Sequence, residues 1–114
     1  MTDCIFCKIA QHEIPGKIVF ENERVIAFHD LFPQAPTHIL IIPKQHYSTL
    51  NDVPASEATL LGELSTTAAA LAKELGVDEK GYRVVMNCNK EGGQSVYHIH
   101  LHLLAGRQLG WPPG

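Results

Sequence analysis

Histidine and apolar residues alternate along residues 96–104, whose sequence is VYHIHLHLL. A period of two is the period of a β-strand, because successive side chains point to opposite faces of the sheet. The pattern therefore predicts a strand with imidazoles on one face and apolar side chains on the other: His98, His100 and His102 against Ile99, Leu101 and Leu103. The apolar face needs a core to cover it, so this segment requires a sheet.

The rest of the chain predicts an α+β fold with a mostly antiparallel sheet. Short apolar runs around Glu21-Asn22-Glu23 read as a hairpin, and the run HILIIP reads as a buried strand. Five apolar residues spaced three and four apart predict one long amphipathic helix, namely Leu61, Leu64, Ala68, Leu71 and Leu75. Pro54 suits its first turn and Gly76 its C-terminal cap. The expected segments are a short helix at 3–9, strands at 18–20, 24–29, 38–43, 82–87 and 96–104, and a turn at 90–94.

Composition narrows the class of protein. The 114 residues predict one domain over 1–114, and a net charge of −3 gives no basic surface for a nucleic acid polymer or an anionic membrane. No apolar run approaches the ~18 residues of a membrane span, and the N-terminus does not resemble a secretory signal. Three cysteines do not make a disulfide framework, so we expect a reducing, cytoplasmic setting.

The three histidines allow three interpretations. They are solvated surface residues, or they bind a metal, or one of them is a nucleophile toward phosphorus. The residues just upstream favour the third interpretation, because Gly92-Gly93-Gln94-Ser95 can offer backbone N–H groups and a hydroxyl to an oxyanion. A catalytic metal held by the three histidines is less convincing without a nearby acidic ligand.

Cys4 and Cys7 have the spacing of metal ligands, which tetrahedral zinc sites use repeatedly. Two further ligands are needed, and His46 and His98 are the candidates. The alternatives are two packed thiols on a short helix and, more weakly, a redox pair. If zinc is bound, the site is structural, and no metal is expected to be required for catalysis.

The chain resembles the histidine-triad (HIT) family, and in particular its nucleotide-binding branch. The segment GGQSVYHIHLHLLAGRQLGWPPG at 92–114 carries the triad motif, and FHDLFPQAPTHILIIPK at 28–44, IFCKI at 5–9 and GYRVVMN at 81–87 carry the remaining likeness. The resemblance spans essentially the whole chain. His102 stands where the nucleotidylyltransferase branch, otherwise similar, carries Gln.

The resemblance implies a sheet of about five strands that continues across a homodimer. It also implies a hydrolase that cleaves the P–N bond of purine nucleoside phosphoramidates, such as AMP or GMP joined to an amine, through a nucleotidyl-histidine intermediate. His100 would be the nucleophile, with His98, His102 and His38 around it. Ser95 would help to protonate the leaving amine. Some relatives have a zinc site similar to the one considered above.

The resemblance also implies a nucleotide site. Asp30 would hold the ribose hydroxyls with Leu31 beside it, Asn87 would line the pocket, and Gly93, Gln94 and Ser95 would approach the phosphate. The purine slot would consist of Phe6, Ile9, Ile18 and Phe28. Taken alone, Asp30 and Asn87 also suit turns, and the apolar residues also suit a plain core.

Three other functions remain open at this point. One is hydrolysis of dinucleoside polyphosphates, which Ser95 and the terminal WPPG disfavour. Another is a nucleotide-binding regulatory or scaffold dimer, and the last is a metal-dependent protein that uses the triad as ligands. Trp111 in the tail is expected to dock near a site, with the dimer partner as one candidate surface.

Overall fold

The computed structural model describes residues 3–114; Met1 and Thr2, with which the expected domain begins, lie outside the described residues. Five strands form one antiparallel sheet in the order β1-β2-β3-β5-β4. The strands are β1 (Ile18–Glu21), β2 (Val25–His29), β3 (Thr37–Pro43), β4 (Tyr82–Val85) and β5 (Leu101–Ala105). The expected α+β class, hairpin and five-stranded sheet are confirmed.

In the described part of the chain, three helices accompany the sheet: α1 (Ile5–Ala10), α2 (Ala58–Glu74) and the single-turn α3 (Asn89–Gly92). Two 3₁₀ turns, Leu50–Asp52 and Ala55–Glu57, precede α2, so the long helix begins after Pro54 rather than at it. Gly76 takes a φ of +73°, and Val77 N–H reaches back to the carbonyl of Ala72 at 2.9 Å. This is the glycine-ended cap that the sequence predicts. No helix within residues 3–114 is both long and apolar enough to cross a membrane.

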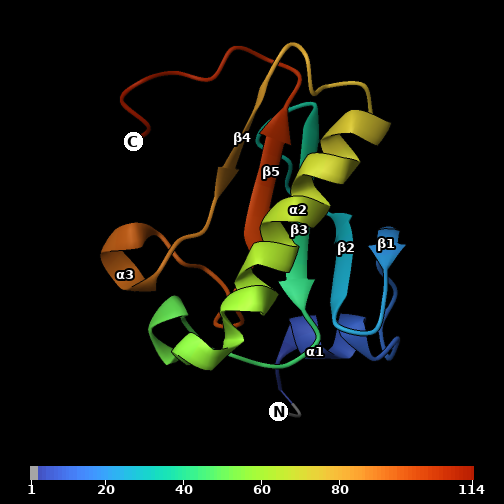
Figure 1. Ribbon diagram of the computed structural model, residues 1–114, viewed down its shortest axis with the longest axis vertical. Coiled ribbons are helices and arrows are strands. Elements are labelled where there is room, and N and C mark those ends of the chain that lie inside the picture. Colours follow the sequence, from blue (N-terminus) through green and yellow to red (C-terminus); the bar gives the residue numbers. More distant parts are fainter. Residues whose placement is uncertain (1–2) are drawn as a thin grey trace.

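The two faces of the sheet carry separate cores. In Figure 1, α2 crosses one face, and it buries Leu64, Ala68 and Leu71 there with Ile39 and Leu103. Four of the five predicted residues face this core, Leu61 only in part; Leu60, which the spacing does not include, is buried there, and Leu75 is exposed. The short α1 covers part of the opposite face, where its apolar residues pack on residues of β2 and β3, namely Ile26, Phe28, Leu40 and Ile42.

The last strand is shorter than the alternation predicts, because β5 begins at Leu101 and residues 96–100 are irregular. Ile99 N–H donates to the carbonyl of Tyr47, 2.8 Å away, instead of to a neighbouring strand. The period of two persists nonetheless, since Ile99, Leu101 and Leu103 all face the α2 core. The expected turn at 90–94 is α3, which ends where Gly93 takes a φ of +85°.

The C-terminal tail lies along its own chain, but the side chain of Trp111 is not buried against the described residues. The guanidinium of Arg83 donates to the carbonyl of Gly110 at 2.7 Å and holds the tail beside β4. Trp111 beyond it is 83% exposed.

Candidate functional site

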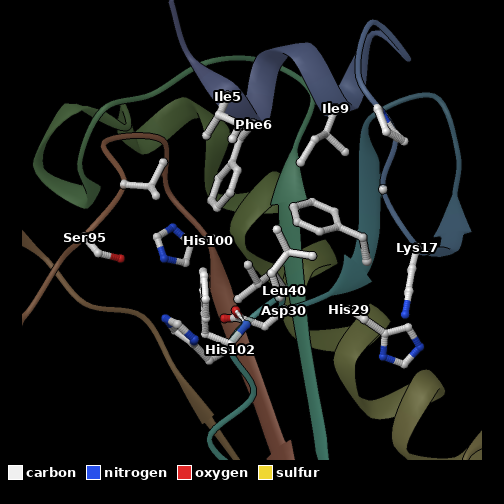
Figure 2. Close-up of a pocket in the computed structure, with 16 residues that line it drawn as sticks. Ile5, Phe6, Ile9, Lys17, His29, Asp30, Leu40, Ser95, His100 and His102 are labelled. Carbon is white, nitrogen blue, oxygen red and sulfur yellow. Dashed lines mark hydrogen bonds between the residues drawn. The ribbon is translucent and has the colours of Figure 1, made fainter.

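A cavity of about 240 Å³ lies on the α1 side of the sheet (Figure 2). One wall is apolar, made by residues of α1, of the strands beneath it and of the irregular segment before β5: Ile5, Phe6, Ile9, Phe28, Leu40 and Val96. Ser95, His100, His102 and Asp30 form a polar end. Lys17 and His29 stand apart from that end on another part of the wall. The cavity thus joins a slot for a flat apolar group to a cluster of groups that can act on an anion.

The structure brings together most of the predicted nucleotide residues. Eight of them line the cavity: Phe6, Ile9, Phe28, Asp30, Leu31, Ser95, His100 and His102. Four others, Ile18, Asn87, Gly93 and Gln94, are not among its lining residues. Ile18 lies opposite Phe28 in the β1–β2 ladder but is 36% exposed, and Asn87 is half-buried beyond the end of β4.

Sequence reasoning missed several lining residues, of which Leu40, Lys17 and His29 are the clearest. A signal for Leu40 was present, because the alternation that puts His38 on this face of β3 also puts Leu40 there. No pattern pointed to Lys17 or His29, since both stand at the ends of strands, where periodicity no longer applies.

Gln94 supports the loop rather than facing the cavity. Its side-chain oxygen accepts from Asn89 N–H at 2.9 Å, and its NH₂ donates to the carbonyls of Ser48 and Val96 at 2.7 and 3.1 Å. The side chain is buried. These bonds tie the loop after α3 to the loop after β3, and they fix the backbone that carries the exposed Ser95.

The hydrogen bond of His100 determines which of its ring nitrogens is reactive. Nδ1 lies 2.8 Å from the carbonyl oxygen of His98. A carbonyl only accepts, so Nδ1 carries the proton and Nε2 carries the lone pair. The ring is buried and lines the cavity. His100 therefore offers the cavity a neutral nucleophile or base.

A second chain of bonds fixes His102 in the complementary form. The N–H of Gln34 donates to Nδ1 of His38 at 3.0 Å, so His38 carries its proton on Nε2. That N–H faces Nδ1 of His102 at 2.9 Å, and it donates there. The neutral His102 ring then has its proton on Nε2. The pair of histidines thus presents one lone pair, on His100, and one N–H donor, on His102.

Burial keeps this cluster neutral. Desolvation, reinforced by the neighbouring histidines, lowers the pKa of His102 from 6.5 to about 4. It also lowers the pKa of His100 and of His38, although nearby Asp30 offsets part of each effect. A neutral imidazole is the form that attacks phosphorus, so the environment favours the reactive state at pH 7.

Asp30 follows β2 and is half-buried between the cavity and His38. Its Oδ1 accepts from Phe32 N–H at 2.8 Å, as a turn aspartate does, and its Oδ2 lies 3.4 Å from Nε2 of His38. The turn interpretation and the cavity interpretation are therefore compatible. A carboxylate oriented in this way retains lone pairs for hydroxyl groups in the cavity.

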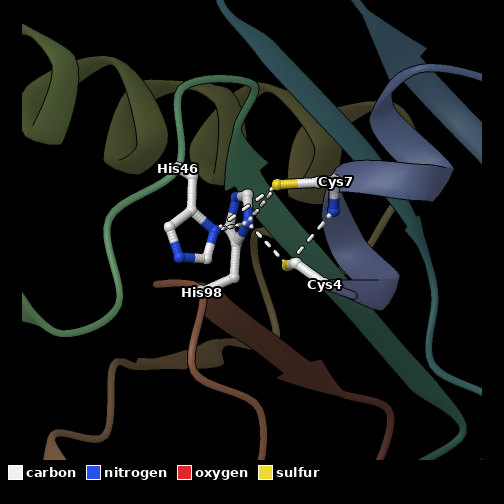
Figure 3. Close-up of side chains that lie close together, drawn as sticks. All are labelled: Cys4, Cys7, His46 and His98. Atoms are coloured by element: carbon white, nitrogen blue, oxygen red, sulfur yellow. Dashed lines mark hydrogen bonds between the residues drawn. The ribbon is translucent and has the colours of Figure 1, made fainter. Parts of the chain in front are cut away.

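Cys4, Cys7, His46 and His98 converge beside this site, as Figure 3 shows. Nδ1 of His98 lies 3.3 Å from Sγ of Cys4, 3.5 Å from Sγ of Cys7 and 3.2 Å from Nδ1 of His46. Sγ of Cys7 lies 3.4 Å from Nδ1 of His46. Tetrahedral zinc with ordinary bond lengths needs edges of about 3.5 Å between S and N and about 3.3 Å between N and N. The four S–N and N–N edges given above are close to these spacings, and all four ligand atoms lie within 4.8 Å of one another.

His98 also carries its lone pair on the atom that faces the cluster. Nε2 of His98 lies 2.8 Å from the carbonyl of Pro43, so the proton is on Nε2 and the lone pair is on Nδ1. Burial lowers the pKa of His98 to about 4, and the ring is neutral. Burial and the hydrogen bond with Cys4 raise the pKa of Cys7 to about 11. A metal ion would therefore displace the proton of this thiol as it binds.

A match to a known protein family shows which family this chain belongs to. The HIT domain model matches residues 11–109. The chain therefore belongs to the HIT family, as its sequence motifs and its histidine cluster predict.

Its relatives are close and cover nearly its full length. It is 54% identical over 108 residues to the purine nucleoside phosphoramidase of Escherichia coli K12. The matched segment covers 95% of this chain and 91% of that protein. The chain is 53% identical to the 14 kDa zinc-binding protein of Zea mays, across 96% and 87% of the two chains. The crystal structure of a HIT family hydrolase from Legionella pneumophila superposes with a TM-score of 0.96 at 57% identity, covering 98% of this chain and all of the other.

Proposed function

We propose that this chain is a purine nucleoside phosphoramidase. The observation that carries the proposal is His100: its Nδ1–H is held by the His98 carbonyl, and its lone pair is therefore on Nε2, in a cavity with an apolar slot. The 54% identity to the Escherichia coli phosphoramidase supports the same activity. The chain is thus an enzyme, a hydrolase of P–N bonds in AMP or GMP joined to an amine.

The first step is attack on phosphorus. Nε2 of His100 forms a new bond to the phosphorus atom, the P–N bond to the amine breaks, and its electron pair leaves with the amine. The amine leaves poorly unless it gains a proton, and the proposed donor is the hydroxyl of Ser95, which lines the polar end of the cavity. The Nε2–H of His102 is the donor available to a phosphoryl oxygen, where negative charge develops.

The second step releases the nucleotide. Water attacks the phosphorus of the nucleotidyl-histidine, the bond to Nε2 breaks, and the electron pair returns to the ring as the lone pair of neutral His100. The proton that water loses returns to the Ser95 oxygen, which gave one to the amine, or passes to solvent. His38 acts through His102, whose tautomer it holds, and His98 acts through the carbonyl that holds His100.

The nucleotide occupies the cavity from its apolar wall to its polar end. Phe6, Ile9 and Phe28 pack around the purine, and Asp30, with Leu31 beside it, accepts from the ribose hydroxyls. The backbone of Gly93, Gln94 and Ser95 approaches the phosphate. Ile18 and Asn87, which do not line the cavity, are proposed to contribute only at its edge.

An assay with paired substrates tests the proposal. Adenosine 5′-phosphoramidate and a dinucleoside polyphosphate are compared by kcat/KM in the presence of a strong chelator. Efficient P–N cleavage with weak polyphosphate cleavage supports the phosphoramidase. The reverse preference identifies a dinucleoside polyphosphate hydrolase, nucleotide binding without turnover identifies a regulatory or scaffold dimer, and activity abolished by the chelator identifies metal catalysis.

We propose a homodimer in which the sheets join. β4 is an edge strand, and its Tyr82 and Val84 are 37% and 41% exposed. An uncovered apolar edge strand tends to pair with another chain, so this edge is the proposed interface. The exposed Trp111 lies in the tail held beside the same edge. Sedimentation of the wild type and of Val84→Lys tests this: the variant shifts to monomer, whereas an unchanged mass contradicts an interface at β4.

We also propose that Cys4, Cys7, His46 and His98 hold a structural zinc ion. The donor set and its spacing support it, and the Zea mays relative is named for zinc binding. All three cysteines are free thiols, which suits a reducing, cytoplasmic setting. The metal, if bound, supplies a fixed crosslink between α1 and the body of the protein. Catalysis as derived above uses no metal.

A further inference from the structure

The nucleotide cavity and the metal cluster share the helix α1. Ile5, Phe6 and Ile9 of this helix line the cavity, while Cys7 and the N-capping Cys4 belong to the cluster. A helix of six residues does not hold its own conformation in water, so its position depends on what ties it to the body. Two things hold α1 in position: its packing on the sheet and the cluster of Cys4, Cys7, His46 and His98.

His98 provides a second connection. Its ring belongs to the cluster through Nδ1, and its own carbonyl accepts the Nδ1–H of His100 at 2.8 Å. His98 therefore has two roles: its carbonyl orients the ring of His100, and its own ring belongs to the metal cluster. A rotation of His98 changes the acceptor that fixes the proton of His100.

Phe6 provides a third connection. Its ring meets the rings of His98 and His100 edge-on, with centroids 5.9 and 5.1 Å away. Because Phe6 stands between Cys4 and Cys7 in the chain, a shift of the two thiols moves this ring against both histidines. The same ring forms part of the purine wall.

We propose that metal occupancy of the Cys4/Cys7/His46/His98 cluster sets the affinity of the cavity for a purine nucleotide and fixes the tautomer of His100. The proposal rests on the metal site proposed above. His98 and Phe6 are then positioning residues, one acting through its carbonyl and the other through its ring. Coupling between two sites is reciprocal, so the nucleotide must raise the affinity for Zn²⁺ by the same factor.

The test uses the full chain, Zn²⁺ and AMP. Metal-free and zinc-loaded protein are titrated with AMP by calorimetry, and zinc affinity is measured by chelator competition with and without saturating AMP. Loss of an outer support of a site typically costs 10–100-fold, so we expect zinc to tighten AMP binding by about tenfold and AMP to tighten zinc binding equally. The ¹⁵N shifts of the His100 ring report its tautomer: one form with zinc, a mixture without it.

His46→Ala is the critical variant, because His46 is a ligand but does not line the cavity. Its AMP affinity should equal that of metal-free wild type and should not respond to added zinc. His12→Ala, in which only the exposed contact to Glu21 is lost, should respond as wild type does.

The outcomes separate the two proposals. Stoichiometric zinc binding with unchanged AMP affinity and an unchanged His100 tautomer overturns the coupling and leaves the metal site standing. Failure to bind zinc at all overturns both the metal site and the coupling, while the phosphoramidase, which uses no metal, is unaffected.

Discussion

Nε2 of His38 lies 2.9 Å from Nδ1 of His102, on the strand next to it. Because the backbone N–H of Gln34 donates to the other nitrogen of His38, the proton between the two rings belongs to His38. The backbone N–H of Gln34 therefore determines, through His38, which ring nitrogen of His102 carries the proton.

Replacement of His38 tests whether it fixes the tautomer of His102. In His38→Ala the ring of His102 loses its donor and populates both tautomers, so we expect kcat to fall about 10–100-fold with little change in KM. His38→Asn, whose amide N–H₂ can still donate, should recover part of the loss. Equal loss in both variants, or a loss confined to KM, would contradict this role of His38.

Ser95→Ala tests assistance to the leaving group. An amine needs a proton to depart, and general acid assistance contributes roughly 10²–10⁴-fold. P–N cleavage should therefore fall far more than cleavage of a nucleotide ester whose leaving group departs without a proton. If the two substrates lose rate equally, Ser95 only positions the phosphate.

The depressed pKa values predict a direction for pH dependence. The pKa of His102 is about 4 in the folded protein against 6.5 in the unfolded chain, so below pH 6.5 the unfolded state binds more protons. The stability associated with this residue is complete above pH 6.5 and is lost as the pH falls toward 4. Burial of His38 acts in the same direction.

Thermal unfolding between pH 4 and 8 measures this effect. Tm should be level above pH 6.5 and should fall steadily below it, and replacement of His102 by Asn should flatten the slope. A Tm that rises on acidification would show that the histidines gain protons on folding.

Zinc removal should affect stability more than the chemical step. A structural site contributes its binding free energy to folding, so a strong chelator should lower Tm by several degrees or more, whereas turnover persists at a reduced level. Cys4→Ser should mimic the chelator, and Cys88→Ser, which alters a thiol outside the cluster, should not. Metal analysis that finds no zinc, with Cys4 and Cys7 freely alkylated, would leave only packed thiols.

Much of the fold could be predicted from the spacing of apolar residues along the chain. The alternation around His98–His102 and the spacing of Leu64, Ala68 and Leu71 report which face is buried, because burial is what selects those residues. The four members of the metal cluster were also named from spacing and residue type. Their convergence requires α1 and the loop after β3 to meet, which only the folded chain provides.

The irregular stretch before β5 was not predictable from the alternation. Ile99 bonds to Tyr47, and the side chain of His100 bonds to its own backbone two residues back, so tertiary and local contacts replace the strand ladder there. The side-chain amide of Gln94 bonds Ser48 and Asn89, partners that lie on separate segments, and no sequence pattern indicated these bonds. Patterns in sequence report burial and period, and they do not report which polar partners meet.

The measurement that tests the central claim most directly is mass spectrometry of protein quenched in acid-free conditions during turnover of a purine nucleoside phosphoramidate. Wild type should carry one nucleotidyl group, localised by peptide mapping to His100. The His100→Ala variant should carry none, should lose several orders of magnitude in rate, and should still bind AMP. A wild-type protein that turns over without any adduct, or a His100→Ala variant with near wild-type turnover, would contradict catalysis through His100.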